Sequence, residues 1–365
     1  MKNTFGSAIC VTLFGESHGE KIGAVIDGLP AGIAVDTELI NKKLNQRKPY
    51  GKISTARREA DEPQIVSGVF NGYTTGTPLT ILINNENKNS TDYSSLLDVP
   101  RPSHADFCAN AKYRGYQDYR GGGHFSGRLT APLVAVGAIL TAALEKKGIK
   151  FGTHISKIMG VSDAQFSDYE SDISLLAERI FPTLSLDAEE EMKSVIESAA
   201  SVGDSVGGVL ESAVIGMPLG VGEPWFDTVE GVLSHALFSI PGVKGVEFGA
   251  GFGFANLTGS AANDPFATDG ERIYTLTNNN GGINGGITNG MPLIFRCAVK
   301  PTPSIFKEQA SVSLSKMENT QLQIKGRHDP AIIHRARAVV DAVTAIVLAD
   351  LLTVKFGTDY LTTEG

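Results

Sequence analysis

Two long segments that are apolar on almost every helical face constrain the fold of this chain most strongly. They run from residue 129 to 147 and from 331 to 354, and each is predicted to form a helix. A helix that is apolar all round belongs in a buried layer, because none of its faces suits water. The second segment is also the one most like a membrane span, but it carries five charged or histidine side chains. We therefore expect no membrane partner.

The predicted strands come mostly as neighbours joined by short turns, and they do not alternate with helices. Residues 8–14 and 22–27 form one such pair, and residues 64–70 and 79–84 form another. A further strand region is expected at residues 243–257. Adjacent pairs of this kind predict antiparallel sheets. The sequence therefore predicts an α+β fold in which antiparallel sheets sandwich a central layer of buried helices.

The composition is typical of a globular protein, and no linker-like stretch divides residues 1–365, so a single domain is expected. The net charge of −8 argues against nucleic acid as a partner. Cys10, Cys108 and Cys297 are far apart and lack zinc-ligand spacing, which indicates reduced thiols and no metal site. The N-terminus lacks the apolar segment of a signal peptide, so a cytoplasmic location is expected.

The stretch from Arg101 to Arg128 is a candidate binding loop. It contains several arginines, two histidines and three consecutive glycines at 121–123. Such glycines suit a backbone that bends sharply or approaches a ligand closely. Arginine favours carboxylate and phosphate, so the stretch predicts a site for an anion. An ordinary surface loop with solvated charges is the alternative.

A second basic stretch, residues 42–58, carries seven lysines and arginines and no acidic residue. In an acidic protein such a reversal of charge either solvates a face or gathers an anionic ligand.

Three titratable residues are candidates for acid–base chemistry. His18 and His104 lie in turn-like contexts among Gly, Ser and Arg, and imidazole titrates near neutral pH. His104 is expected in the first turn of a short helix. Asp329 precedes the second apolar helix, where it either caps that helix or serves as a base.

The segment Gly15 to Gly19 matches the G-x-S-x-G pattern of a nucleophile elbow. That elbow needs a strand, a turn and then a helix, whereas residues 22–27 are predicted as a strand. A serine hydrolase that uses Ser17 is therefore a weak alternative. The glycine-rich stretches also lack dinucleotide-binding spacing.

Six motifs together resemble the chorismate synthase family. They are Gly-Glu-Ser-His-Gly at 15–19, Arg-Pro-Ser-His-Ala-Asp at 101–106, Asp-Tyr-Arg-Gly-Gly-Gly at 118–123, Gly-Gly-Ile-Asn-Gly-Gly-Ile-Thr-Asn-Gly at 281–290, Lys-Pro-Thr-Pro-Ser at 300–304 and Gly-Arg-His-Asp-Pro at 326–330. The resemblance runs from about residue 4 to about 352, and it implies the same two-sheet sandwich around central helices.

The resemblance implies a reaction, a cofactor and partners. The reaction is a 1,4-anti elimination of phosphate from 5-enolpyruvylshikimate 3-phosphate that yields chorismate, the last common step of aromatic amino acid biosynthesis. Reduced FMN is required although there is no net redox change, and NADPH enters only indirectly, through flavin reduction. Because the chain has no added oxidoreductase domain, an external flavin reductase is expected, and the family suggests a homotetramer.

The resemblance also implies roles for individual residues. His18 would be the general acid near the departing phosphate, and His104 would stabilise the charge of the reduced flavin. Asp329 would work with flavin N5 to remove the ring proton, while Ser17 and Ser126 would support proton transfer. The implied flavin contacts are His124, Phe125, Ser126, Ala262, Asn263, Gly285, Lys300, Pro301, Thr302, Pro303, Ser304 and Arg327.

A cationic wall around the substrate or flavin phosphate is implied as well. Its members would be Arg47, Lys52, Arg101, Arg128 and Arg327. A substrate with two carboxylates and a phosphate needs several cations before it can leave water. The departing phosphate is then stabilised where charge develops.

The chain departs from the family pattern in two places. His124 and Phe125 stand where Arg followed by Ser or Ala is common, and Lys48 and Lys52 stand where Arg is common. Lysine is a point charge rather than a planar fork, so substrate geometry is expected to differ there. A non-catalytic module that binds flavin or an anion is the remaining alternative.

Overall fold

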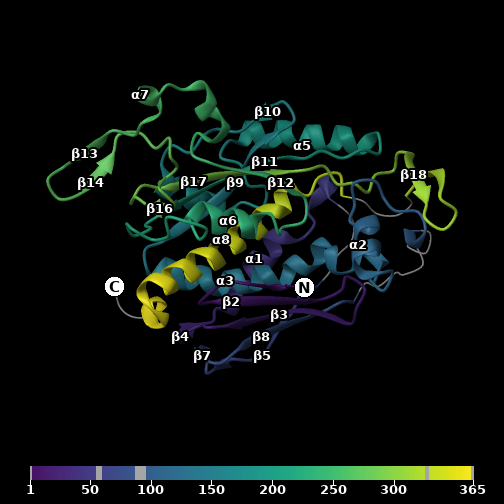
Figure 1. The fold of residues 1–365 in the computed structure, drawn as a ribbon, viewed down its shortest axis with the longest axis horizontal. Coiled ribbons are helices and arrows are strands. Elements are labelled where there is room, and N and C mark those ends of the chain that lie inside the picture. Colours follow the sequence, from purple (N-terminus) through teal and green to yellow (C-terminus); the bar gives the residue numbers. More distant parts are fainter. Residues whose placement is uncertain (1, 55–59, 87–95, 325–328, 363–365) are drawn as a thin grey trace.

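The computed structural model describes residues 2–54, 60–86, 96–324 and 329–362. Two five-stranded antiparallel sheets enclose a layer of helices between them (Figure 1). The predicted α+β sandwich is therefore confirmed.

The first sheet has the strand order β1–β2–β3–β8–β5. Its strands are β1 (Thr4–Phe5), β2 (Cys10–Gly15), β3 (Lys21–Asp27), β8 (Leu79–Asn84) and β5 (Pro63–Ser67). Alternate residues of β3 and β8 are fully buried, and the register pairs Ile22 with Ile83 and Ala24 with Ile81. One face of this sheet therefore packs on the helices, as expected for an antiparallel sheet. A smaller sheet consists of β4 (Ala31–Ala34), β7 (Tyr73–Thr75) and β6 (Val69–Phe70).

The central layer contains α1 (Thr37–Arg47), α3 (Thr130–Lys146) and α8 (Ile333–Phe356). Both predicted apolar helices are thus present. They cross in close contact, because a Cβ atom added at Gly137 would lie 2.4 Å from the Cα atom of Ala342. Among the described residues, the helical segment 127–146 is long and apolar enough to cross a membrane, yet 89% of its apolar window is buried inside the protein. It is a core helix, and it replaces 331–354 as the segment most like a span.

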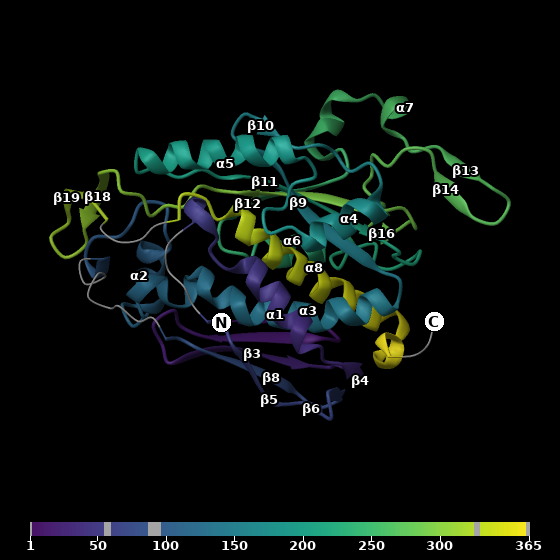
Figure 2. The same ribbon diagram turned by 180° about the vertical axis from the view of Figure 1, so that it is seen from behind.

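The second sheet has the order β10–β9–β11–β17–β12. Its strands are β10 (Val161–Ser162), β9 (Lys150–Ile158), β11 (Gly208–Ile215), β17 (Leu293–Val299) and β12 (Val243–Phe248). Thr153 of β9 donates a hydrogen bond of 2.7 Å to Asp341 of α8, which fixes the inner face. Helices α4 (Tyr169–Glu178) and α5 (Leu186–Ser201) accompany this sheet, and α5 lies on its side away from the first sheet (Figure 2). Helix α6 (Val229–Leu237) lies beside α8.

The expectation of strands through residue 257 is wrong. Strand β12 ends at Phe248, and a 3-10 helix, η5 (Gly251–Asn256), follows. Gly249 and Gly251 adopt φ angles of 53° and 54°, which an extended strand cannot contain. Strand β12 therefore ends before these glycines.

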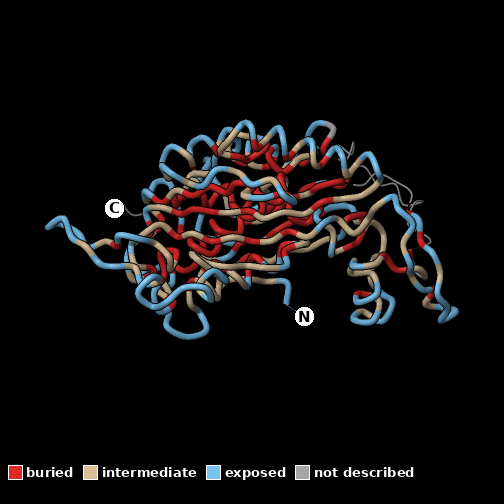
Figure 3. Tube along the Cα trace, turned by 90° about the horizontal axis from the view of Figure 1, so that it is seen from above, coloured by how far each residue is buried: buried red, intermediate tan, exposed pale blue. Residues whose placement is uncertain are grey.

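Two exposed extensions project from opposite ends of the sandwich (Figure 3). One carries α7 (Gly259–Ala262) and the hairpin of β13 (Phe266–Thr268) and β14 (Ile273–Thr275). The other carries the hairpin of β18 (Gln309–Ser313) and β19 (Glu318–Leu322), near α2 (Asp106–Tyr113). The remaining short elements are η1 (Gly51–Ile53), η3 (Arg120–Phe125), η4 (Gly127–Leu129), β15 (Ile283–Asn284), β16 (Ile287–Thr288) and η6 (Thr358–Leu361).

Candidate active site

The three consecutive glycines of η3 lie against both candidate histidines. Gly121, Gly122 and Gly123 have φ angles of 58°, 89° and 54°, which favour glycine. A Cβ atom at Gly121 would lie 2.3 Å from Cε1 of His18, and one at Gly122 would lie 3.3 Å from Cε1 of His104. The backbone of this glycine loop (residues 121–123) thus approaches both imidazoles closely.

The turn at residues 15–19 is fastened to the glycine loop. The backbone N–H of Ser17 donates to the carbonyl oxygen of Gly123 at 3.0 Å. Nδ1 of His124 lies 2.8 Å from the carbonyl oxygen of Gly15, so His124 donates this bond and its role here is structural. Ser17 and His18 are both buried, and the Ser17 hydroxyl has no hydrogen-bond partner among the described residues. A buried hydroxyl of this kind is suited to a ligand or water.

The same turn lacks the setting of a nucleophile elbow. Strand β2 ends at Gly15 and β3 begins at Lys21, so the turn joins two antiparallel strands. No helix follows it directly, and the elbow context required by a serine hydrolase is absent.

His104 belongs to a charge cluster with Asp106 and Arg101. Nδ1 of His104 lies 2.6 Å from Oδ1 of Asp106. The guanidinium group of Arg101 donates to both carboxylate oxygens of Asp106 through Nε and Nη2, each at 2.8 Å. Helix α2 begins at Asp106, so the expectation that His104 lies in its first turn is wrong by two residues.

The carboxylate of Asp106 fixes how His104 is presented. Burial raises the pKa of Asp106, but the hydrogen bonds from Arg101 and His104 outweigh it and hold that pKa well below its usual range. An ionised carboxylate accepts the proton of Nδ1, which leaves Nε2 of His104 on the far side of the ring. A Cβ atom at Gly122 would lie 3.4 Å from this Nε2, so the glycine loop faces it.

The segment that follows β17, Lys300 to Ser304, joins the His104 cluster. Arg101 donates through Nη1 to the Ser304 hydroxyl at 3.3 Å, and Nζ of Lys300 contacts the carbonyl oxygen of Ser103. Burial, assisted by Lys244, lowers the pKa of Lys300. The Thr302 hydroxyl, between Pro301 and Pro303, is buried without a partner among the described residues. Two of the predicted flavin contacts, Lys300 and Ser304, therefore bond to residues that neighbour His104.

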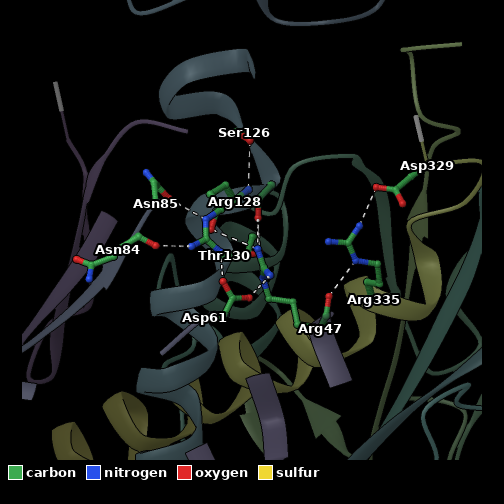
Figure 4. Close-up of polar contacts among 10 residues, drawn as sticks. Arg47, Asp61, Asn84, Asn85, Ser126, Arg128, Thr130, Asp329 and Arg335 are labelled. Atoms are coloured by element: carbon green, nitrogen blue, oxygen red, sulfur yellow. Dashed lines mark hydrogen bonds and ion pairs between the residues drawn. The ribbon is translucent and has the colours of Figure 1, made fainter. Parts of the chain in front are cut away.

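Arg47 and Arg128 form a buried pair with a carboxylate between them (Figure 4). Asp61 accepts from Nη1 of Arg47 at 3.1 Å and from Nη1 of Arg128. The three side chains are only 6%, 5% and 1% exposed for Arg47, Arg128 and Asp61. Arg47 also donates through Nε to the Thr130 hydroxyl at 2.9 Å. The two arginines are thus brought together around one buried carboxylate.

Arg128 also connects the ends of β8 and η3 (Figure 4). Its Nε donates to Oδ1 of Asn85 at 2.9 Å, and its Nη2 donates to the carbonyl oxygen of Asn84 at 3.1 Å. The Ser126 hydroxyl accepts from the backbone N–H of Arg128 at 3.3 Å and caps η4. Ser126 therefore has a structural bond in addition to its predicted chemical role.

Asp329 forms an ion pair at the start of α8. Nη1 of Arg335 lies 2.7 Å from Oδ2 of Asp329, and Nε of Arg335 donates to the carbonyl oxygen of Arg47 at 2.9 Å (Figure 4). The alternative that Asp329 caps the helix is wrong, because the N-cap is Ile332 and no side chain caps it. Arg335 thus links the carboxylate to the end of α1, next to the buried arginine pair.

Two of the predicted cationic residues lie wholly or partly outside the part of the chain that the structure describes. Arg327 lies outside the described residues. The backbone of Lys52 lies in η1, but its side chain is outside what the structure describes. After η1, the Ser54 hydroxyl meets Nε2 of His334 at 2.7 Å. Burial lowers the pKa of His334 to about 3, so the ring is neutral and accepts this bond.

Ala262, Asn263 and Gly285 do not join the site within one chain. Ala262 ends α7, Asn263 follows it, and Gly285 lies between β15 and β16. Both views place α7 and β16 at the end of the molecule opposite α2 and β18 (Figures 1 and 2). Phe125 does lie near His104, with its ring edge-on to Tyr113 at 6.1 Å between centroids.

Sequence reasoning missed four residues that hold this site together. They are Asp61, Asn85, Asp106 and Arg335, and each contacts a candidate that the sequence did identify. Asp106 could have been found, because it lies two residues after His104 in a motif that also contains Arg101. Among the described residues, no group of three or more His, Cys, Asp or Glu side chains could hold a metal ion.

The sandwich and its site define a class of protein: an α+β enzyme fold with two histidines against one glycine loop and buried arginines nearby. A family model described as chorismate synthase matches residues 9–353. The chain belongs to the chorismate synthase family, and it is accordingly an enzyme of the lyase class.

Relatives of known name agree over almost the whole chain. A chorismate synthase of Thermococcus gammatolerans is 49% identical over 347 residues, which cover 95% of this chain and 96% of the relative. A chorismate synthase of Dehalococcoides mccartyi is 47% identical over 352 residues, with 96% of each chain covered. A solved structure titled "Crystal Structure of Chorismate Synthase" superposes with a TM-score of 0.76 at 28% identity, and it covers 98% of this chain and 95% of its own.

Proposed function

We propose that this enzyme eliminates phosphate from 5-enolpyruvylshikimate 3-phosphate in a 1,4-anti reaction that yields chorismate. This is the last common step of aromatic amino acid biosynthesis. The observation that carries the proposal is the placement of His18 and His104 against adjacent glycines of one loop. In a member of this family, that placement puts two groups suited to proton transfer against one backbone segment.

His18 is proposed as the general acid for the departing phosphate. Its turn is fixed by the bond from Ser17 to Gly123, and both side chains are buried. The unpartnered Ser17 hydroxyl lies beside it and can donate to a phosphate oxygen or relay a proton. A preorganised donor in a dry site stabilises charge where it develops during the reaction.

His104 is proposed to stabilise negative charge in the site. The Asp106 carboxylate sets the orientation of its ring. Nε2 is then the atom that faces the reacting groups, and the Arg101 guanidinium adds a positive charge nearby. Asp329, held by Arg335, is proposed to accept the proton that leaves the substrate ring, acting with flavin N5. Ser126 would support this transfer.

We propose that the substrate is held mainly by the arginines around the glycine loop. Arg47, Arg101 and Arg128 are buried, and each already contacts a carboxylate of the protein. Paired arginines of this kind keep a fixed geometry, which suits recognition of carboxylate and phosphate oxygens. Lys52 and Arg327 would complete the wall.

The residues beside His104 fit reduced FMN, which supplies electron density to the reacting ring when it is bound. The buried Thr302 hydroxyl needs a polar partner, and Lys300 and Ser304 stand next to it in sequence. His124, Phe125, Pro301 and Pro303 would line the same place.

We propose a homotetramer in which a second copy covers the flavin. Ala262, Asn263 and Gly285 lie at the opposite end of the chain, so they would reach a flavin only from another subunit. Their extension exposes large apolar side chains, including Phe252 at 85% and Phe266 at 74%. Exposed apolar patches commonly mark a surface that another protein chain covers.

Three further expectations accompany this function. The main hydrophobic cluster of the described residues extends from Ile9 to Leu361, which supports one domain over residues 1–365. We propose a cytoplasmic enzyme. NADPH would act only indirectly, through an external flavin reductase.

The test uses purified full-length protein, the enolpyruvyl substrate and anaerobically reduced FMN. Chorismate and phosphate should appear together in equal amounts, and oxidised FMN should support neither. Flavin binding without release of phosphate would instead favour a non-catalytic binding module. Replacing reduced FMN by FMN and NADPH alone should give no product unless a separate reductase is added.

A further inference from the structure

Asn85 links the two halves of the candidate site. It follows directly after β8 and is buried. Its Oδ1 accepts from Nε of Arg128 at 2.9 Å (Figure 4). Its Nδ2 donates to the carbonyl oxygens of Glu16 and Gly19, each at 3.0 Å. One amide group therefore ties the turn that carries Ser17 and His18 to the arginine at the start of α3.

The orientation of this amide is fixed by chemistry. A guanidinium group can only donate hydrogen bonds, and a carbonyl oxygen can only accept them. If the amide were flipped, its NH2 group would face Arg128 and its oxygen would face two carbonyl oxygens, so all three bonds would be lost. No other side chain of this size offers one acceptor and two donors in this arrangement. The Asn85 amide thereby holds the turn at residues 15–19 in one geometry.

The backbone of Asn85 adds to the same connection. Its N–H donates to the carbonyl oxygen of Glu20 at 3.0 Å. The turn is therefore held on one side by Asn85 and on the other by the bond from Ser17 to Gly123. Arg128, at the other end of the amide, is fixed in turn by Asp61.

We propose that Asn85 is a positioning residue that sets where His18 stands relative to Arg128. It would act through His18 and would not touch the substrate. This inference rests on the proposed function of His18 as a general acid. A displaced general acid slows the chemical step more than it weakens substrate binding, because proton transfer needs hydrogen-bond distance.

The neighbouring residue provides a matched control. Asn84 has an exposed side chain, and only its backbone carbonyl accepts from Arg128. Figure 4 shows both asparagines beside Arg128. Asn85→Asp keeps an oxygen for Arg128 but turns both donors to Glu16 and Gly19 into acceptors. Asn84→Asp makes the same chemical change one residue away and leaves the link intact.

The first measurement is steady-state turnover. Asn85→Asp should lower kcat by about tenfold or more and change KM by less than about threefold, whereas Asn84→Asp should stay within about twofold in both. In a His18→Ala background, Asn85→Asp should cost less than about a further threefold, because residues that act together are not additive. Wild-type kcat in Asn85→Asp, or an undiminished loss in the His18→Ala background, would overturn the proposal.

The second measurement does not depend on activity. Amide hydrogen exchange at Ser17 and Gly19 should become about tenfold faster or more in Asn85→Asp and stay unchanged in Asn84→Asp. If the wild-type protein makes no chorismate, the proposed function fails, and this exchange experiment alone decides whether Asn85 holds the turn. If Asn85→Asp does not fold, Asn85→Ser removes the same donors without adding a charge, and unchanged exchange in that variant contradicts the proposal.

Discussion

The Nδ1 atom of His104 lies 2.6 Å from Oδ1 of Asp106, and Arg101 donates hydrogen bonds to both oxygens of the same carboxylate. This pairing makes the histidine part of a fixed three-residue unit. Its Nε2 atom is then the one presented to the glycine loop. The orientation of His104 is accordingly a property of Asp106 as much as of the histidine itself.

Replacing Asp106 by Asn should therefore impair the reaction. We expect kcat/KM to fall by about 10- to 100-fold, or roughly 1.4–2.7 kcal/mol of barrier, because a neutral amide cannot pair with Arg101 and His104 as the carboxylate does. Glu178→Gln is the control, since its ion pair with Lys42 is exposed and should contribute little. A kcat/KM within about twofold of wild type in Asp106→Asn would contradict the role of this pair.

The same substitution should change how stability depends on pH. The folded protein holds the pKa of Asp106 below its usual value of 3.8. The carboxylate therefore stabilises the fold above that value, and the contribution is lost as pH falls through the lower folded pKa. Urea unfolding should show wild type to be more stable than Asp106→Asn at pH 7. The difference in unfolding free energy between the two proteins should become smaller below about pH 4. A difference that stays constant with pH would contradict this role of Asp106.

Asp61 is expected to be a large contributor to stability. Asp61→Asn would leave Arg47 and Arg128 side by side, buried and without an anion between them. Breaking a buried ion pair in this way costs about 3–5 kcal/mol. Glu247→Gln, which removes a partly exposed partner of Arg296, should cost less than about 1 kcal/mol. Denaturant unfolding measures both, and equal losses would show that burial of the arginine pair does not matter.

His154 should make stability fall as pH rises above neutrality. Its ring lies between Asp163, at 2.7 Å from Nδ1, and Glu211, at 3.1 Å from Nε2, while Glu211 also contacts Arg296. Burial lowers the pKa of His154, but the two carboxylates outweigh it and raise that pKa above 6.5.

A raised folded pKa means that the folded state binds the proton more tightly. Its stabilising contribution is complete below about pH 6.5, and it is lost as pH rises through the folded pKa. His154→Gln should be less stable than wild type at pH 6, with a difference that shrinks toward pH 9. Chemical unfolding at several pH values measures this, and a difference that grows with pH would have the wrong sign.

Gly121 should not tolerate even one added methyl group. Gly121→Ala places a Cβ atom 2.3 Å from the ring of His18, in addition to the strain of a φ angle of 58°. We expect kcat to fall by about tenfold or more, because the imidazole must move. Gly115→Ala carries a comparable φ strain, at 79°, but its nearest neighbour is 3.5 Å away. It should lose stability without losing activity, and matching activities in the two variants would refute the steric argument.

Much of the fold could be read from the sequence because its signals are local. The apolar helices and the paired strands depend on neighbouring residues, and both are present. The motif residues around His18 and His104 also proved to be close together. The strand expected through residue 257 failed because the conformation of Gly249 and Gly251 depends on their surroundings.

The residues that hold the site could not be read in the same way. Asp61 meets an arginine 67 positions away, and Asn85 meets the same arginine across 43. A single sequence does not say which carboxylate or amide bonds to which guanidinium group. Only the crossing of the helices and strands brings such partners within hydrogen-bond distance.

The close crossing of α3 and α8 at Gly137 and Ala342 has a consequence for the geometry of the reaction. Arg128 precedes one helix and Asp329 precedes the other, so the distance between these two candidate residues depends on how closely the helices cross in the core. Gly137 lies about 10 Å along α3 from its first residue, by the rise of 1.5 Å per residue. One methyl group added at that crossing would push the two helices apart and change the distance between Arg128 and Asp329. The spacing of the candidate site is therefore set by a contact in the protein core, which the substrate does not reach.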